Sequence, residues 1–249
     1  MKISVLVNGA RGRMGREVVQ AVKAETDLSL VGETDLGDSL DRAIASSRAQ
    51  VVVDFTEPSS AARNTETILR SGARPVVGTT GFRPEDLSRL EALAAELRLG
   101  GLIAPNFAIG AVLLMKFAAE AVRFLPDVEI IELHHGEKAD APSGTAKKTA
   151  ELIAAGRGAL PAHAAVPKAG EESVQGVRGG RYQGIPIHSV RLPGLVAHQE
   201  VLLGGLGQIL TLRHDSISRA SFMPGVVLAV RKAPKLDRLY YGLETILEI

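Results

Sequence analysis

The chain contains no cysteine, carries almost no net charge and has no long apolar run. Without cysteine it forms no disulfide and no thiolate metal site. A net charge of +1 over 249 residues gives no overall attraction to nucleic acid or to an anionic membrane, so anion binding must come from local clusters. The first apolar run is too short for a secretory signal, and no stretch of about 20 apolar residues follows. These absences favour a cytoplasmic protein with neither a nucleic acid nor a membrane as partner.

The first hundred residues indicate a parallel sheet. Hydrophobic residues make up 45% of the chain and charged residues 23%, which is ordinary for a globular chain of one large or two small domains. Short β-branched runs alternate with helical patterns, which is typical of βαβ units. Strands are expected at 3–7, 28–32, 51–55, 75–78 and 101–104, with a helix after the first strand and others at 59–71 and 84–99. The alternation predicts an α/β, Rossmann-type doubly wound fold.

A glycine-rich turn follows the first predicted strand. Gly9, Gly12 and Gly15 have the spacing Gly-x-x-Gly-x-x-Gly, a variant of the commoner Gly-x-Gly-x-x-Gly. Between a strand and a helix, such glycines allow a tight turn and close approach of the backbone to a pyrophosphate. Glu33 and Asp35 stand at the end of the second strand, where a carboxylate would accept hydrogen bonds from the adenosine ribose. A dinucleotide site is therefore expected.

The residues near this turn leave the choice between NADH and NADPH open. A carboxylate at the ribose favours NADH, whereas Arg11 and Arg13 are placed to neutralise the 2′-phosphate of NADPH. The alternative is that both arginines are solvated loop charges.

Two further loops lie at the carboxyl ends of predicted strands. They are Gly78-Thr79-Thr80-Gly81 and Ala104-Pro105-Asn106-Phe107, and residues 54–56 end the third strand in the same way. Open α/β sheets bind ligands at such ends. A purely structural role in the turns that end these strands would explain the glycines and the proline equally well.

The pattern changes from about residue 106. A helix at 110–124 is followed by strands at 128–133, 187–191, 199–203 and 208–213, which predicts a second, α+β domain on a mixed or antiparallel open sheet. Residues 204–207 lie between two β runs with no helix after them and predict a hairpin connection. Residues 156–184 are expected to form a long, poorly structured connection. Residues 226–247 are helical in pattern.

The most informative segment is 132–146, Glu-Leu-His-His-Gly-Glu-Lys-Ala-Asp-Ala-Pro-Ser-Gly-Thr-Ala. It places two imidazoles, an ammonium and a Ser-Gly-Thr turn just ahead of a helical pattern. Histidine titrates near neutral pH, lysine adds a compact cation, and the amides at the start of a helix attract a carboxylate or phosphate. A strand end and a helix capped by Ser143 would explain the parts singly, but a packed structural segment gains little from the combination. The segment is expected to bind an anion and give it a proton.

This segment resembles the signature of the dihydrodipicolinate reductases, Glu-x-His-His-x-x-Lys-x-Asp-x-Pro-Ser-Gly-Thr-Ala, at every fixed position. The resemblance continues in order over nearly the whole chain, at 9–15, 53–56, 77–81, 104–107 and 213–215. It implies reduction of 4-hydroxy-tetrahydrodipicolinate to tetrahydrodipicolinate by NADH or NADPH, in diaminopimelate and lysine biosynthesis. It also implies a first domain made of 1–106 with about 216–249, a second domain at about 107–215, and a homotetramer formed through the second domain.

The resemblance also assigns substrate-side roles to residues of the segment. It implies His134 as general acid/base and Lys138 as proton donor. The implied substrate contacts are His135, Ser143, Gly144 and Thr145. Arg213, which closes a predicted strand, is an additional candidate for charge stabilisation.

On the cofactor side, the resemblance favours Asp35 over Glu33 as the ribose ligand. Many members of the family have a basic residue at the next position, which is Leu36 here, so use of NADPH would depend on Arg11 and Arg13. The implied cofactor-binding residues are Gly9, Ala10, Arg11, Gly12, Arg13, Met14, Gly15, Asp35, Phe55, Gly78, Thr79, Thr80, Ala104, Pro105, Asn106 and Phe107.

Two other classes of protein share this scaffold: an aspartate- or homoserine-type dehydrogenase, and a non-catalytic dinucleotide sensor. Such a dehydrogenase should lack the His-His-x-x-Lys segment, and a sensor should have lost its His or Lys while keeping the glycine turn. This chain has both features. No metal site is expected, because His134 and His135 adjoin on an extended strand and point to opposite faces.

Overall fold

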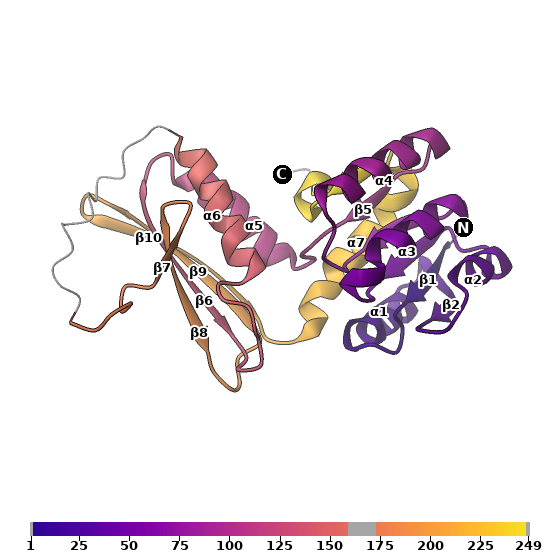
Figure 1. Cartoon of the computed structure of the whole chain (residues 1–249), viewed down its shortest axis with the longest axis horizontal. Coiled ribbons are helices and arrows are strands. Elements are labelled where there is room, and N and C mark those ends of the chain that lie inside the picture. Colours follow the sequence, from indigo (N-terminus) through magenta and orange to yellow (C-terminus); the bar gives the residue numbers. More distant parts are fainter. Residues whose placement is uncertain (1, 159–172, 248–249) are drawn as a thin grey trace. The chain divides into compact units, whose positions relative to one another are not determined.

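The computed structural model describes residues 2–158 and 173–247. The chain divides into two compact units, residues 1–109 with 219–249 and residues 110–218, and Figure 1 follows the chain through both. The domain limits expected from the sequence stay a prediction. None of the described helices is long and apolar enough to cross a membrane.

The first unit contains a six-stranded parallel sheet with the strand order β11-β5-β4-β3-β1-β2. Its strands are β1 (Ile3–Asn8), β2 (Leu28–Thr34), β3 (Val51–Asp54), β4 (Arg74–Val77), β5 (Gly101–Ile103) and β11 (Leu239–Tyr241). The central strand β3 is buried along its whole length, as expected of a parallel strand with helices over both faces. The structure confirms the predicted Rossmann-type sheet.

Helices cover both faces of this sheet. α1 (Arg13–Ala24) lies beside α7 (Met223–Lys232), whereas α2 (Leu40–Ser47), α3 (Pro58–Arg70) and α4 (Pro84–Leu97) lie side by side in chain order. The strand order reverses at β1, and right-handed connections then place the preceding and following helices on opposite faces. α3 and α4 each begin with a proline, at the position where its missing N–H costs least.

The C-terminal tail corrects the prediction of a helix over 226–247. α7 ends at Lys232, and Pro234 lies in the short 3₁₀ helix η2 (Ala233–Lys235) that follows. The strand β11 then pairs in parallel with β5 at the edge of the sheet, and η3 (Leu243–Ile246) comes after it. The prediction was wrong because a strand of three residues is too short to show its period of two against helical spacing. A further 3₁₀ helix, η1 (Arg219–Phe222), precedes α7.

The second unit contains a mixed five-stranded sheet with the order β10-β9-β6-β8-β7. Its strands are β6 (Asp127–His134), β7 (Gly180–Tyr182), β8 (Ile185–Arg191), β9 (Ala197–Gly205) and β10 (Gln208–Ser216). β6 runs parallel to β8 and antiparallel to β9. β9 and β10 pair as the predicted hairpin, and the mixed sheet confirms the predicted architecture of this part.

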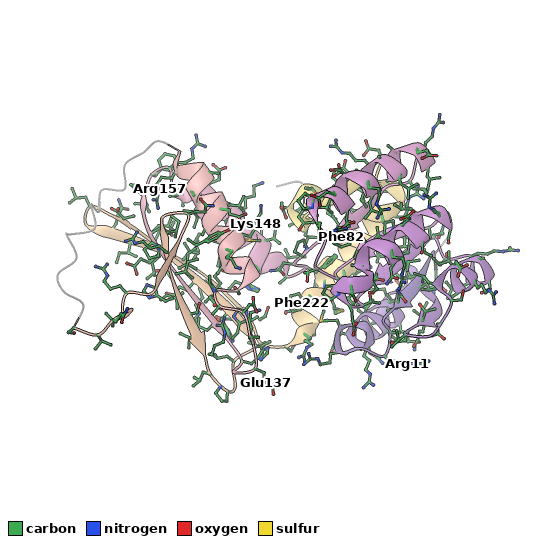
Figure 2. All side chains as sticks on the ribbon, viewed as in Figure 1. Arg11, Phe82, Glu137, Lys148, Arg157 and Phe222 are labelled. Carbon is green, nitrogen blue, oxygen red and sulfur yellow. The ribbon has the colours of Figure 1, made fainter. Side chains whose placement is uncertain are left out.

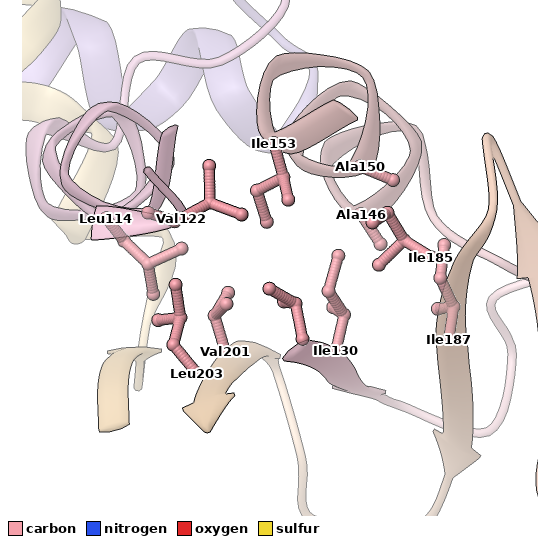
Figure 3. Packing of buried hydrophobic residues seen from close by; sticks show 12 residues of the cluster. Leu114, Val122, Ile130, Ala146, Ala150, Ile153, Ile185, Ile187, Val201 and Leu203 are labelled. Carbon is pink, nitrogen blue, oxygen red and sulfur yellow. The ribbon is translucent and has the colours of Figure 1, made fainter. Parts of the chain in front are cut away.

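Two helices, α5 (Ile109–Ala121) and α6 (Gly144–Arg157), cover one face of this sheet. Figure 3 shows the apolar side chains of the two helices directed at side chains of β6, β8 and β9. None of the described helices packs on the opposite face of this sheet, which we call the outer face. Because side chains alternate between the two faces along a strand, every second side chain lies on it. Ile131, Leu133, Leu202 and Ile209 lie on the outer face.

The connection expected at 156–184 is only partly described. Residues 159–172 lie outside the described residues. α6 continues to Arg157, and β7 pairs with β8, so both ends of the expected connection contain regular structure. The prediction of an unstructured segment was wrong at these two ends.

Candidate functional site

The turn between β1 and α1 brings the backbone close to itself and to a neighbouring loop. Gly9 has a φ of +79°, and a Cβ there would lie 2.4 Å from the carbonyl oxygen of Phe55. A Cβ on Gly15 would lie 2.0 Å from the carbonyl oxygen of Gly9. Gly12 precedes the first residue of α1, and no side chain caps this helix. An uncapped helix N-terminus presents backbone N–H groups and a positive dipole end, which suit a pyrophosphate.

Asp35, at the end of β2, is tied to this turn. Its carboxylate accepts hydrogen bonds from the backbone N–H of Arg11 at 2.7 Å and of Leu36 at 2.8 Å. The bond from Leu36 and then that from Arg11 hold the pKa of Asp35 below its usual range. The other predicted candidate, Glu33, lies 3.4 Å from the ammonium of Lys23. The geometry therefore favours Asp35 as the carboxylate that faces a ligand in the turn.

A buried carboxylate at the end of β3, Asp54, joins the ends of three strands. It has no exposed surface. It accepts hydrogen bonds from Asn8 at 2.7 Å, from Asn64 at 3.0 Å, from the Thr56 hydroxyl at 2.8 Å and from the Thr79 hydroxyl at 2.7 Å. Asp54 thus fixes the loops after β1, β3 and β4 relative to one another.

A cavity of about 710 Å³ opens at this end of the first sheet. The predicted cofactor residues that line it are Gly9, Gly12, Arg13, Met14, Asp35, Phe55, Gly78, Thr79 and Thr80. The predicted residues that do not line it are Ala10, Arg11, Gly15, Ala104, Pro105, Asn106 and Phe107. Phe107 nevertheless contacts the site through Phe55, since their ring centroids are 5.8 Å apart.

In the second unit, a fully buried carboxylate on β6 holds the first histidine of the segment. Oε2 of Glu132 lies 2.5 Å from Nδ1 of His134, and Arg191 of β8 donates to both carboxylate oxygens, at 2.8 and 3.0 Å. Burial alone would raise the pKa of Glu132, but hydrogen bonds from His134, Arg191 and Ser189 outweigh it and lower the pKa from 4.5 to about 2. Glu132 is therefore ionised at neutral pH. Because an ionised carboxylate only accepts hydrogen bonds, Nδ1 of His134 must carry the proton between them.

Lys138 lies in the loop between β6 and α6, which also contains Glu137, labelled in Figure 2. The Lys138 ammonium donates to Asp140 at 2.7 Å, and this bond, above all, lowers the pKa of Asp140. The Lys138 backbone N–H donates to the carbonyl oxygen of His135 at 3.2 Å. Arg191 donates to the carbonyl oxygen of Asp140 at 2.6 Å. The loop that carries Lys138 is thus bound to the same guanidinium as Glu132.

The helix α6 begins beside this cluster. Ser143 is its N-cap: the hydroxyl accepts from the N–H of Ala146 at 3.1 Å, and its own N–H donates to Glu132 at 3.2 Å. Ser143 is buried, whereas Gly144 is exposed and Thr145 half-buried. The hydroxyl of Ser143 therefore serves the helix, and the amides of the next two residues form the accessible start of α6.

Arg213 does not join this cluster. In the registers of β6, β9 and β10, Glu132 pairs with Gln199, and Arg213 pairs with Glu200, the next residue. Since neighbouring residues point to opposite faces, Arg213 lies on the outer face, away from Glu132. There it forms ion pairs with Glu200 at 2.8 Å and Asp215 at 3.0 Å.

Sequence reasoning missed Glu132 and Arg191 as members of the site. One signal was present for Glu132. Val128 and Ile130 are core residues of β6, so a period of two places position 132 on the same buried face. An acidic residue there requires buried partners.

The fold and the glycine turn define an α/β dinucleotide-binding protein with a second, mixed-sheet unit. Family models described as dihydrodipicolinate reductase, N-terminus, and dihydrodipicolinate reductase, C-terminus, match residues 3–107 and 110–247. The chain belongs to the dihydrodipicolinate reductase family.

Similar proteins match this chain over its full length. The 4-hydroxy-tetrahydrodipicolinate reductase of Geobacillus kaustophilus is 51% identical, covering 100% of both chains. The protein of the same name from Coxiella burnetii is 48% identical, over 99% of this chain and 100% of its own. A solved structure of dipicolinate-bound dihydrodipicolinate reductase from Paenisporosarcina sp. TG-14 is 44% identical, with a TM-score of 0.90 over 99% of this chain and 100% of that chain.

Proposed function

We propose that this chain is a 4-hydroxy-tetrahydrodipicolinate reductase, an NAD(P)H-dependent oxidoreductase of diaminopimelate and lysine biosynthesis. The observation that carries the proposal is the cluster of Glu132, His134 and Lys138 beside the start of α6. It occurs in a chain that matches reductases of this name from end to end.

The first unit fits a dinucleotide by its own geometry. Any Cβ would fill the turn at Gly9 and Gly15, and the uncapped start of α1 faces the same turn. We assign the pyrophosphate to residues 9–15 and the adenosine ribose to Asp35. We assign the nicotinamide side to Phe55 and the loops at 78–80 and 104–107. When bound, the reduced nicotinamide supplies the hydride that a ring carbon of the substrate accepts.

The second unit supplies anion-binding groups for a cyclic dicarboxylate. The amides of Gly144 and Thr145 hold one carboxylate at the start of α6, where the helix dipole favours negative charge. His135 contacts the substrate, and Ser143 orients the turn as its cap. Support comes from the Paenisporosarcina relative, which is bound to dipicolinate.

The same unit supplies the proton. After the substrate loses its hydroxyl as water, the resulting conjugated imine takes up one hydride and one proton to become tetrahydrodipicolinate. Lys138 donates this proton, and Asp140 holds its ammonium in the loop. His134 acts as general acid/base through Nε2, since Nδ1 is bound to Glu132.

The adenosine end of the first unit favours NADH, which we expect to be used at least as well as NADPH. Asp35 and Asp38 place two carboxylates there, and Leu36, in place of a basic residue, is almost fully exposed. The Arg11 guanidinium, labelled in Figure 2, is mostly exposed and lies 4.0 Å from Asp38. A 2′-phosphate would therefore meet repulsion from two carboxylates before it gained the Arg11 or Arg13 charge.

We further propose a cytoplasmic homotetramer assembled through the second unit. The outer face of its sheet carries Ile131, Leu133 and Leu202, and Ile209 on β10 is 74% exposed. An apolar sheet face with an open edge strand is a liability that copies of the same chain can cover.

A coupled assay tests the proposed reaction. The substrate is made in situ from pyruvate and aspartate semialdehyde, and the absorbance of NADH or NADPH is followed. We expect the absorbance to fall only when both precursors and the chain are present. A folded chain that oxidises neither cofactor under these conditions would refute the proposal.

A further inference from the structure

The carboxylate of Glu132 connects four parts of the second unit. Oε2 accepts from Nδ1 of His134 and from Arg191, and Oε1 accepts from Arg191 and from the N–H of Ser143. Arg191 also donates to the carbonyl oxygen of Asp140. A single buried ion pair therefore joins the end of β6, the end of β8, the Lys138 loop and the start of α6.

This arrangement decides which nitrogen of His134 is available for chemistry. Nδ1 is the donor in the 2.5 Å contact with the ionised carboxylate. None of the hydrogen bonds among the described residues uses Nε2 of His134, so this is the nitrogen left for a substrate. A carboxylate behind Nδ1 also stabilises the imidazolium that forms when Nε2 takes a proton.

We infer that Glu132 is the positioning residue of His134, and that Arg191 holds Glu132 in the ionised, fixed state that this role requires. The kinetic part of this inference rests on the proposed reductase function, whereas the tautomer of His134 does not. Arg191 is suited to the role because its planar guanidinium binds both carboxylate oxygens at once. Lysine at position 191 would offer a point charge without this geometry.

The same strand offers a matched control. Glu129 also contacts a histidine, with Oε2 lying 2.7 Å from Nε2 of His188. Its side chain is 40% exposed, and it lies on the outer face, opposite Glu132. Glu129→Gln therefore makes the same chemical change in a Glu–His pair that is not near the proposed site.

The test combines NMR of the imidazoles with kinetics. The six histidines are labelled with ¹⁵N, and the His134 signals are assigned by their loss in His134→Gln. In the wild type we expect the Nδ1–H tautomer at neutral pH. In Glu132→Gln the side-chain amide donates to Nδ1 instead, so we expect the Nε2–H tautomer and a loss of kcat on the order of 10²-fold or more, as for a misoriented catalytic histidine.

Two further readouts separate positioning from general damage. We expect KM to change by less than about threefold in Glu132→Gln, because the substrate-binding amides remain. Glu129→Gln should retain the wild-type tautomer of His134 and the wild-type kcat.

Two results would overturn the inference. One is a wild-type His134 in the Nε2–H form. This measurement is made on the wild type, so it tests the inference even if Glu132→Gln fails to fold. The other is a folded Glu132→Gln with kcat within about threefold of the wild type. If the wild type itself fails to reduce the substrate, the proposed function fails, while the tautomer measurement still tests the role of Glu132.

Discussion

Replacing Glu132 by glutamine should remove a pH-dependent contribution to the stability of the second unit. Burial opposes the charge of Glu132, but hydrogen bonds from His134, Arg191 and Ser189 lower its pKa to about 2, against an ordinary 4.5. A carboxyl group whose pKa is lowered on folding stabilises the folded state fully above its unfolded pKa. That stabilisation is lost as the pH falls from about 4.5 towards 2.

The size of the effect follows from the two pKa values. At about 1.4 kcal/mol per pH unit, the difference between 4.5 and about 2 amounts to about 3 kcal/mol at neutral pH. Glu132 has no exposed surface, and its partners Arg191 and His134 are 19% and 13% exposed, so solvent screens this interaction only weakly. Near pH 3 only about 1 to 1.5 kcal/mol should remain, because Glu132 is then protonated in most of the unfolded chains but still ionised in most of the folded ones. Wild type and Glu132→Gln should thus converge in stability as the pH is lowered.

Urea unfolding followed by circular dichroism, at one protein concentration, measures this convergence. The free energy of unfolding is compared for wild type, Glu132→Gln and the outer-face control Glu129→Gln between about pH 7 and pH 3. We expect the difference in free energy of unfolding between wild type and Glu132→Gln to fall by about half or more over this range. The difference between wild type and Glu129→Gln should stay small at every pH. If the free energy of unfolding of the wild type exceeds that of Glu132→Gln by the same amount at both ends of the pH range, Glu132 does not stabilise the folded state through its charge.

Three other predictions concern catalysis, cofactor choice and assembly. His134→Gln and Lys138→Ala should each lower kcat on the order of 10²-fold or more with the fold intact, as judged by circular dichroism, and near wild-type turnover in both would reject their roles. Arg11→Ala combined with Arg13→Ala should raise the KM for NADPH more than that for NADH, and a strong NADPH preference that survives both changes would place the phosphate contact elsewhere. Light scattering at micromolar concentration should report a tetramer, and a monomer would contradict the proposed assembly.

The first sheet could be predicted largely from local pattern, because its buried strands are short β-branched runs between helical stretches. The elements that were missed are those with little local signal. α2 spans eight residues that include two serines, and Ile44 is the only residue it buries. β7 and β11 span three residues each, so their pairing with β8 and β5 decides their conformation rather than their own sequence.

Some residues of the site are close together in the sequence, whereas others are brought to it only by the fold. The segment that contains His134, Lys138 and Ser143 is contiguous, so its chemistry is visible in the sequence. The partner that fixes it is not, because Arg191 is 59 residues from Glu132 and reaches it only through the parallel pairing of β6 and β8. Arg213 stood out as a charged strand end, and only the strand register shows that it faces the other way.

Transfer of a hydride from a reduced nicotinamide to 4-hydroxy-tetrahydrodipicolinate defines the activity proposed for this chain. The measurement that tests it most directly is mass spectrometry of the product formed with NADH deuterated at the transferred position. We expect tetrahydrodipicolinate that carries one deuterium, and on the order of a hundredth as much of this product, or less, with His134→Gln over the same period. Deuterium that remains in the nicotinamide, or a product other than tetrahydrodipicolinate, would contradict it.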